Sequence, residues 1–273
     1  MITLLKHEAL RTRGILGIGA GLLALLVLLG TVLSATRWPM LAPLGIMLGG
    51  IALGVLAPAL QLLLTADYYR SSYSRTGYFT HALPIRGGKI YAAKVIWAWL
   101  VTIAALATSL LLAGIYWVGL ATFLGADRNP FTAVAGLWDS ITAVTSTGML
   151  IAGAAFLLAM YLIWPVQYFF AVSRGSERPL NRWGLGGPVL VFVILYAASQ
   201  VASMIGLFVL PFGLAMQDGS LGFVPYSLIN ELRIGGGGDS ETMPLGFLPA
   251  LLLLSAYCLW RTVRSWNRKV SLV

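Results

Sequence analysis

The sequence predicts an all-α membrane protein with six transmembrane helices and both termini in the cytoplasm. Of its 273 residues, 59% are hydrophobic and only 10% are charged, whereas soluble domains carry roughly 25% charged residues. Six apolar runs are each long enough for a helix to cross a bilayer. They lack the alternating polarity of barrel strands, and helices satisfy their own backbone groups in lipid. Basic residues are also distributed unevenly between the runs, which indicates an orientation.

The chain is predicted to form a single transmembrane domain over residues 1–273. Residues 1–14 mix apolar and basic side chains, which is typical of an amphipathic helix on the inner membrane surface. The longest polar connections are a cytoplasmic loop at 66–89 and an outer loop at 217–243. The six spans are expected at 15–34, 40–65, 90–124, 140–172, 188–216 and 244–260.

The basic residues give the orientation. All of the lysines and arginines fall on one side of the predicted membrane, except Arg37, Arg128 and Arg233. Loops rich in lysine and arginine stay in the cytoplasm, so that side is the inner one. The first apolar run is longer than the core of a signal peptide, and we expect it to be retained as a span. This pattern suits a multi-pass protein of the plasma membrane, with a bacterial inner membrane as the expected setting.

Several kinds of chemistry have no residues to support them. No ionisable side chain lies near the centre of a predicted span, so we expect no enzyme and no catalytic residue. A metal site is not expected, because the chain has one cysteine and two histidines. Gly87, Gly88 and Lys89 are followed by Ile90, so they do not make a phosphate-binding loop. The net charge of +9 lies beside the spans, which favours membrane lipid over nucleic acid as a partner.

Polar side chains within the spans are uncharged and few. They have two interpretations: hydrogen bonds between helices, or the lining of a substrate path. The second interpretation singles out Gln61, Ser199, Gln200 and Ser203. Glycines spaced four residues apart predict close helix packing at Gly17/Gly21, Gly45/Gly49 and Gly50/Gly54.

The segment 67–94 is the longest polar and basic stretch between two spans. Tyr78, Phe79, Ala82 and Leu83 have the spacing of one helix face, and Pro84 ends that helix. The sequence thus predicts a short amphipathic helix across the inner membrane surface. Two interpretations remain: a helix that lies on lipid, and a contact for a soluble partner.

In this segment the chain resembles the membrane subunit of type 2 ABC exporters. Members of that family carry a glycine, an apolar helix ending before proline, a small or basic turn, and a lysine on the next span. The residues of this chain that correspond are Gly77, Tyr78, Phe79, Thr80, His81, Leu83, Pro84, Arg86 and Lys89. Where the family usually carries acidic residues near the glycine, this chain has Ser74, Arg75 and Thr80.

The resemblance implies a permease subunit of an ATP-driven exporter, with the segment around Tyr78–Leu83 as a coupling helix. It implies two ATP-binding cassette subunits per complex, which hold ATP and Mg²⁺, and a second copy of this chain or a related permease. This chain would then need no cofactor of its own. The apolar spans suit a hydrophobic or amphipathic substrate, such as a lipid, a drug or a peptide. The alternative is a non-transporting scaffold or accessory subunit.

Overall fold

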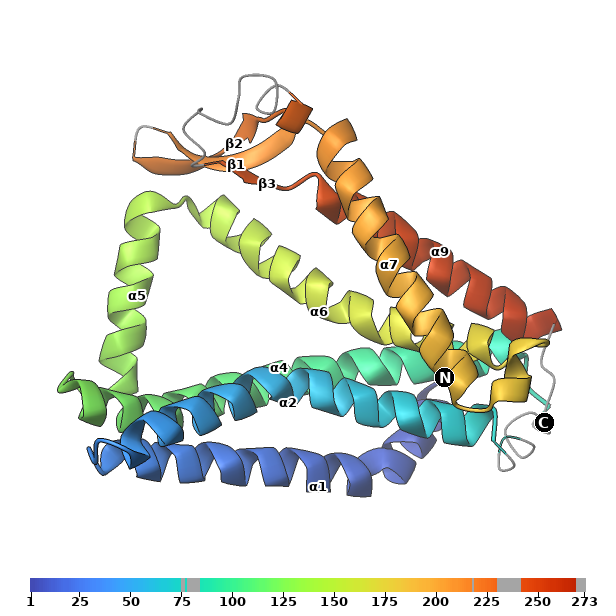
Figure 1. The fold of residues 1–273 in the computed structure, drawn as a ribbon, viewed down its shortest axis with the longest axis horizontal. Coiled ribbons are helices and arrows are strands. Elements are labelled where there is room, and N and C mark those ends of the chain that lie inside the picture. The colour runs from blue at the N-terminus through green and yellow to red at the C-terminus, as the bar shows by residue number, and fades with distance from the viewer. Residues whose placement is uncertain (75–76, 78–83, 218, 230–241, 269–273) are drawn as a thin grey trace. The chain divides into compact units, whose positions relative to one another are not determined.

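The computed structural model describes residues 1–74, 77, 84–217, 219–229 and 242–268 (Figure 1). These residues include six helices that are long and apolar enough to cross a membrane, so the chain is a multi-pass membrane protein. Many apolar side chains on these helices are exposed, including Leu110, Leu111 and Leu253 at 76%, 74% and 72%, as expected for surfaces that face lipid. The chain divides into two compact units, Met1–Trp138 and Asp139–Val273.

The first unit is built around three long helices. These are α1 (Ile2–Ala35), α2 (Leu41–Ser72) and α4 (Gly87–Leu124), and each contacts the other two (Figure 1). Helix α4 has 38 residues, which at 1.5 Å per residue makes it about 57 Å long. Because the hydrocarbon core is about 30 Å thick, such a helix must tilt or extend into water.

Glycines bring the backbones of α1, α2 and α4 together. A Cβ atom at Gly30 would lie 2.6 Å from the backbone nitrogen of Gly49 and 2.7 Å from the carbonyl oxygen of Gly45. A Cβ at Gly119 would lie 2.4 Å from the carbonyl oxygen of Thr31. The predicted close packing at Gly45 and Gly49 is thus confirmed. A Cβ at Gly17, Gly21 or Gly54 would meet nothing within 4 Å, so the prediction was wrong for those helix faces within the unit.

The second unit contains three long helices and a small sheet. Helices α6 (Thr147–Gly175), α7 (Gly186–Val209) and α9 (Phe247–Arg268) pack together, and the 3₁₀ helix η1 (Leu180–Trp183) joins α6 to α7. Strands β1 (Phe212–Gln217), β2 (Ser220–Pro225) and β3 (Met243–Pro244) form an antiparallel sheet in the order β2-β1-β3 (Figure 1). In register, Phe212 faces Pro225 and Leu214 faces Met243.

Helix α5 (Pro130–Val144) has no buried residue and crosses the division between the two units. Phe131, Val134, Trp138 and Ile141 are all exposed, and their spacing places them on one face of the helix. An amphipathic helix of this kind is suited to the membrane surface.

The first structural correction concerns residues 1–14. The sequence predicts a separate interfacial helix there, but these residues are the first turns of the continuous helix α1. Glu8 and Thr12 in these turns are buried and accept hydrogen bonds from Lys94 and Trp97 of α4, so this segment packs against α4. Two predicted spans also end too early: α2 continues to Ser72 and α9 to Arg268, beyond the predicted limits of 65 and 260.

The second correction concerns the predicted spans 140–172 and 188–216. Residues up to Val144 belong to α5, and α6 starts after Ser146, whose hydroxyl accepts a hydrogen bond from the Met149 backbone as an N-cap. Helix α7 ends at Val209 because Leu210, which precedes Pro211, adopts an extended conformation. Residues 212–216 then form strand β1, so the fold is not purely α-helical. Membrane orientation stays a prediction.

Candidate functional site

The predicted coupling residues are only partly visible. Tyr78, Phe79, Thr80, His81 and Leu83 lie outside the described residues. Gly77 is buried, and its backbone nitrogen donates to the carbonyl oxygen of Ser74 at 2.8 Å. Pro84, Arg86 and Lys89 are exposed at the start of α4, where Arg86 is the N-cap residue. The basic end of the loop is therefore accessible to another molecule.

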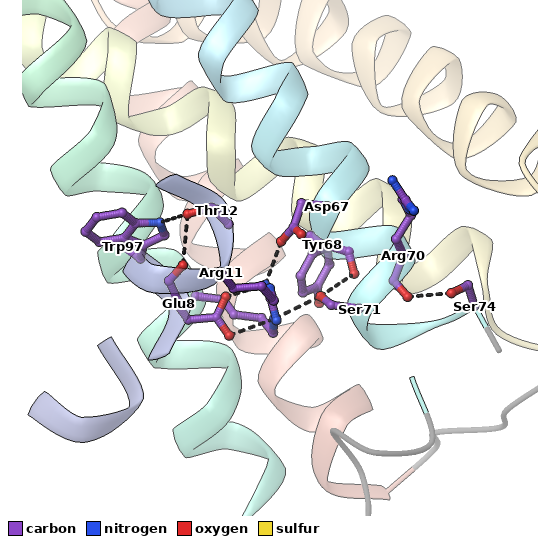
Figure 2. Close-up of polar contacts among 10 residues, drawn as sticks. Glu8, Arg11, Thr12, Asp67, Tyr68, Arg70, Ser71, Ser74 and Trp97 are labelled. Atoms are coloured by element: carbon purple, nitrogen blue, oxygen red, sulfur yellow. Dashed lines mark hydrogen bonds and ion pairs between the residues drawn. The ribbon is translucent and has the colours of Figure 1, made fainter. Parts of the chain in front are cut away.

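Four charged residues meet at the base of this loop. Lys94 of α4 donates to Glu8 of α1 and to the hydroxyl of Ser71 of α2, each at 3.0 Å. Arg11 of α1 donates to Glu8 at 2.5 Å and to Asp67 of α2 at 2.6 Å. Figure 2 shows Glu8, Arg11 and Asp67 turned toward one another. We call Glu8, Arg11, Asp67 and Lys94 the ionic cluster.

The ionic cluster has a formal charge of zero, and two of its four side chains are buried. Lys94 is 3% exposed and Glu8 is 7% exposed. Buried charges are tolerated only when they are paired and hydrogen-bonded, and two carboxylates here face two cations. Next to the cluster, the Trp97 indole donates to the Thr12 hydroxyl at 2.9 Å, and that hydroxyl donates to the Glu8 carbonyl oxygen (Figure 2).

The position of the ionic cluster matters for the loop. Asp67 and Ser71 lie near the end of α2, and Lys94 lies near the start of α4, so both helices that border the loop are held to α1. The sequence places these four residues on the cytoplasmic side of the predicted membrane but does not pair them. The available signal was four charges at the same end of three consecutive predicted helices.

Gln61, one of the predicted substrate-path residues, has a structural partner. Its side-chain amide donates to the Thr102 hydroxyl at 3.2 Å, and both residues are buried between α2 and α4. This arrangement favours the interpretation of a hydrogen bond between helices over that of a path lining.

The other three predicted path residues lie together. Ser199, Gln200 and Ser203 on α7 line a cavity of about 390 Å³ in the second unit. Tyr196, also on α7, lines this cavity too. The other lining residues are Leu251 on α9 and, on α6, Met160, Ile163, Trp164 and Gln167. Gln167 was not predicted as part of this site, although the sequence shows it as an amide inside a span. Its amide nitrogen lies 3.5 Å from the Ser255 hydroxyl, which is long for a hydrogen bond.

A second carboxylate joins helices in the second unit. Glu177 follows α6 and accepts hydrogen bonds from Ser265 at 2.5 Å and Arg261 at 3.1 Å on α9, and it also pairs with Arg174. Burial raises the pKa of the Glu177 carboxyl, but the Ser265 hydrogen bond and the two guanidinium groups outweigh burial. The pKa of Glu177 therefore lies below its ordinary value.

This lowered pKa predicts a pH dependence of stability. The ionised Glu177 carboxylate contributes to the free energy of unfolding. This contribution is fully present above the unfolded-state pKa of about 4.3 and is lost as the pH falls through the lower folded-state pKa. We expect Glu177→Gln to reduce the acid-induced loss of stability by up to about 1.4 kcal/mol per pH unit in that window. Thermal unfolding between about pH 7 and about pH 3 measures this effect. Asp139→Asn, which removes an exposed carboxylate, is the control; equal acid sensitivity in wild type and Glu177→Gln would contradict the expectation.

Within the described part of the chain, no group of three or more His, Cys, Asp or Glu residues could hold a metal ion. The ionic cluster offers ion pairs at the loop base, and the cavity lined by Ser199, Gln200 and Ser203 offers hydrogen-bonding groups. Comparison of the chain with protein families, with functionally characterised proteins and with solved structures finds no match.

Proposed function

We propose that this chain is the membrane-spanning permease subunit of an ATP-driven exporter. It moves a hydrophobic or amphipathic substrate outward across the plasma membrane of a bacterium. The ATPase activity is supplied in trans by two ATP-binding cassette subunits, which hold ATP and Mg²⁺. A second copy of this chain or a related permease completes the membrane part.

The cavity lined by Ser199, Gln200 and Ser203 is the observation that carries this proposal. A helical unit whose only task is assembly gains nothing from an open cavity in an apolar span, because filled cores are more stable. Ligand cavities, by contrast, are mostly apolar, have a few oriented polar groups, and measure about 300–1,000 Å³. The cavity of about 390 Å³ falls in that range.

The ionic cluster supports the energy-input part of the proposal. A partner that binds the segment 77–89 needs a stiff connection to the spans, and the cluster ties α1, α2 and α4 at the base of that segment. Arg86 and Lys89 are exposed there and suit an acidic surface on the partner. Charge asymmetry between the loops supports the placement of this segment in the cytoplasm.

The test is reconstitution of the chain in lipid vesicles with the ATPase subunit that co-purifies with it. We expect complexes that are inserted inside-out, with the ATPase subunits outside the vesicle, to move a fluorescent amphiphile into the vesicle lumen when ATP is added. Replacing both Phe79 and Leu83 with aspartate is expected to leave membrane insertion intact and to abolish substrate-dependent ATPase stimulation. The reason is that the apolar face predicted from the sequence for the segment 78–83 would become anionic.

Leu185→Asp is the matched control, because Leu185 is an exposed leucine that precedes α7 outside this segment. The Leu185→Asp variant should retain substrate-dependent ATPase stimulation. Normal stimulation in the Phe79→Asp, Leu83→Asp variant would contradict the coupling role. A complex that contains the ATPase but moves no amphiphile would instead identify the chain as a scaffold or accessory subunit.

A further inference from the structure

One face of helix α6 lines two successive cavities in the second unit. Met149, Gly153 and Phe156 line the first, and Met160, Trp164 and Gln167 line the second. The intervals between these residues are three or four, so they form a single stripe along the helix. Helix α9 repeats the arrangement, with Leu248 in the first cavity and Leu251 in the second.

The two cavities differ in chemistry. The one around Gln167 presents amide and hydroxyl groups from Gln167, Ser199, Gln200 and Ser203. The other, of about 360 Å³, lies between α6 and the three-stranded sheet and is lined only by residues with apolar side chains or, at Gly153, with none. Its lining residues are Met149, Ala152, Gly153, Phe156, Phe212, Leu214, Phe223, Met243, Leu245 and Leu248.

The cavities also lie next to each other. Phe156 of the apolar cavity and Met160 of the polar cavity are one helical turn apart, as are Leu248 and Leu251 on α9. Between Gly153 and Trp164, near the middle of each lining, the helix rises about 16 Å. This separation matches the length of an acyl chain that fills one leaflet, which is about 15 Å, or half of the hydrocarbon thickness.

We propose that these two cavities together bind one single-chain amphiphile with an uncharged hydroxyl or amide headgroup. The headgroup occupies the cavity of Gln167, Ser199, Gln200 and Ser203, and the end of the chain lies under the sheet beside Phe156. The proposal names the ligand class of the site that carries the proposed function, and in that respect it rests on that function.

The charge of the headgroup follows from the lining. None of the described lining residues of either cavity is ionised, so a phosphate or an ammonium group would lose its hydration without gaining a counter-charge. A hydroxyl or a neutral amide can exchange hydrogen bonds with the glutamine amides and the serine hydroxyls. Ser199 already donates to the Tyr196 carbonyl oxygen at 2.7 Å, and a fully apolar molecule would add no hydrogen bond to any of these groups.

The experiment uses the purified full chain in phosphatidylcholine nanodiscs, without any ATPase subunit. The probe is hexadecanoylglycerol with a photoreactive diazirine on the terminal carbon of its chain. After irradiation, mass spectrometry is expected to find the label on peptides that contain Phe156 and the strands β1 and β2. Unlabelled hexadecanoylglycerol should compete, whereas hexadecyl phosphate and hexadecyltrimethylammonium should not.

Two variants separate the two halves of the site. A Cβ at Gly153 would meet nothing within 4 Å, and Gly153 lines the apolar cavity, so Gly153→Leu is expected to occupy part of that cavity. It should lower labelling at least about tenfold, because the chain end is excluded. Gly148→Leu, on the same helix but outside both linings, should leave labelling unchanged. Gln200→Leu should lower probe affinity about fivefold, as expected for the loss of one hydrogen bond.

Label spread over the exposed faces of α1 and α5, or equal competition by hexadecyl phosphate, would overturn the proposal. Unchanged labelling in Gly153→Leu would do so as well. Because binding is read without ATP, its failure is separate from failure of the proposed function. A complex that transports an amphiphile but is not labelled would support the permease function and refute this ligand site. Specific labelling of a chain that transports nothing would support the ligand site and refute the permease function.

Discussion

Lys94→Met is expected to destabilise the first unit by about 3–5 kcal/mol, the cost of breaking a buried ion pair by removing one partner. Lys94 is 3% exposed and contacts Glu8 and Ser71. Without it, two carboxylates share the single guanidinium of Arg11, and the ionic cluster has a formal charge of −1 in a partly buried site. Unfolding of the full chain in mild detergent, followed by helical circular dichroism, measures the change.

A double variant distinguishes charge imbalance from lost packing. Glu8→Gln combined with Lys94→Met restores a neutral cluster, since Arg11 and Asp67 remain paired. We expect the double variant to be more stable than Lys94→Met alone by about 1–3 kcal/mol, the size of a coupling between contacting residues. Lys89→Met, an exposed lysine on the same helix, should change stability by less than about 0.5 kcal/mol. Equal effects of Lys89→Met and Lys94→Met would rule out the ionic cluster as a stabilising feature.

The six membrane-capable helices could be predicted from hydropathy, because a helix in lipid must be apolar over about 20 residues. The ends of these helices could not, since hydropathy does not report backbone conformation. Residues 212–216 are as apolar as a span, yet they form strand β1. The usable signal was Pro211, which disfavours helix at Leu210.

The candidate sites were predictable to different degrees. Ser199, Gln200 and Ser203 lie close in sequence with helical spacing, so their meeting in one cavity follows from local geometry. Gln167 joins them only through packing of α6 on α7, which depends on which faces the helices bury. The pairing of Glu8 with Lys94 likewise joins residues far apart in the chain. Their positions relative to the predicted spans placed both on the cytoplasmic side but did not indicate that they are in contact.

Close helix packing at glycines shows the same limit. The four-residue spacing of Gly45 and Gly49 marks a small-residue face on α2, but the same spacing occurs at Gly17 and Gly21. Only the structure shows that Gly30 of α1 faces the first pair, whereas the second pair meets nothing within 4 Å in this unit. The motif therefore identifies surfaces capable of close approach and does not select the partner.

Gly30→Leu is expected to destabilise the first unit by about 3 kcal/mol or more, because overpacking costs about 1–3 kcal/mol and this contact is with backbone. A Cβ at Gly30 already lies 2.6 Å from the Gly49 nitrogen and 2.7 Å from the Gly45 oxygen. Neither atom can move unless the two helices separate, and separation would also weaken the hydrogen bonds and packing that they share. Glycine has a low helix propensity, so its replacement by leucine would stabilise α1 by at most about 1 kcal/mol. The clash is larger, and we therefore expect a net loss of stability.

Gly21→Leu is the matched control, since Gly21 is on the same helix and a Cβ there meets nothing within 4 Å. It should be neutral or stabilising by up to about 1 kcal/mol, the propensity difference alone. Gly30→Ala gives the intermediate case, with an expected loss of about 1–2 kcal/mol after that propensity gain is included. Unfolding of the four proteins in one detergent should therefore rank Gly21→Leu and wild type above Gly30→Ala, and Gly30→Leu last. If Gly30→Leu were as stable as Gly21→Leu, then α1 and α2 would not be in backbone contact at Gly30.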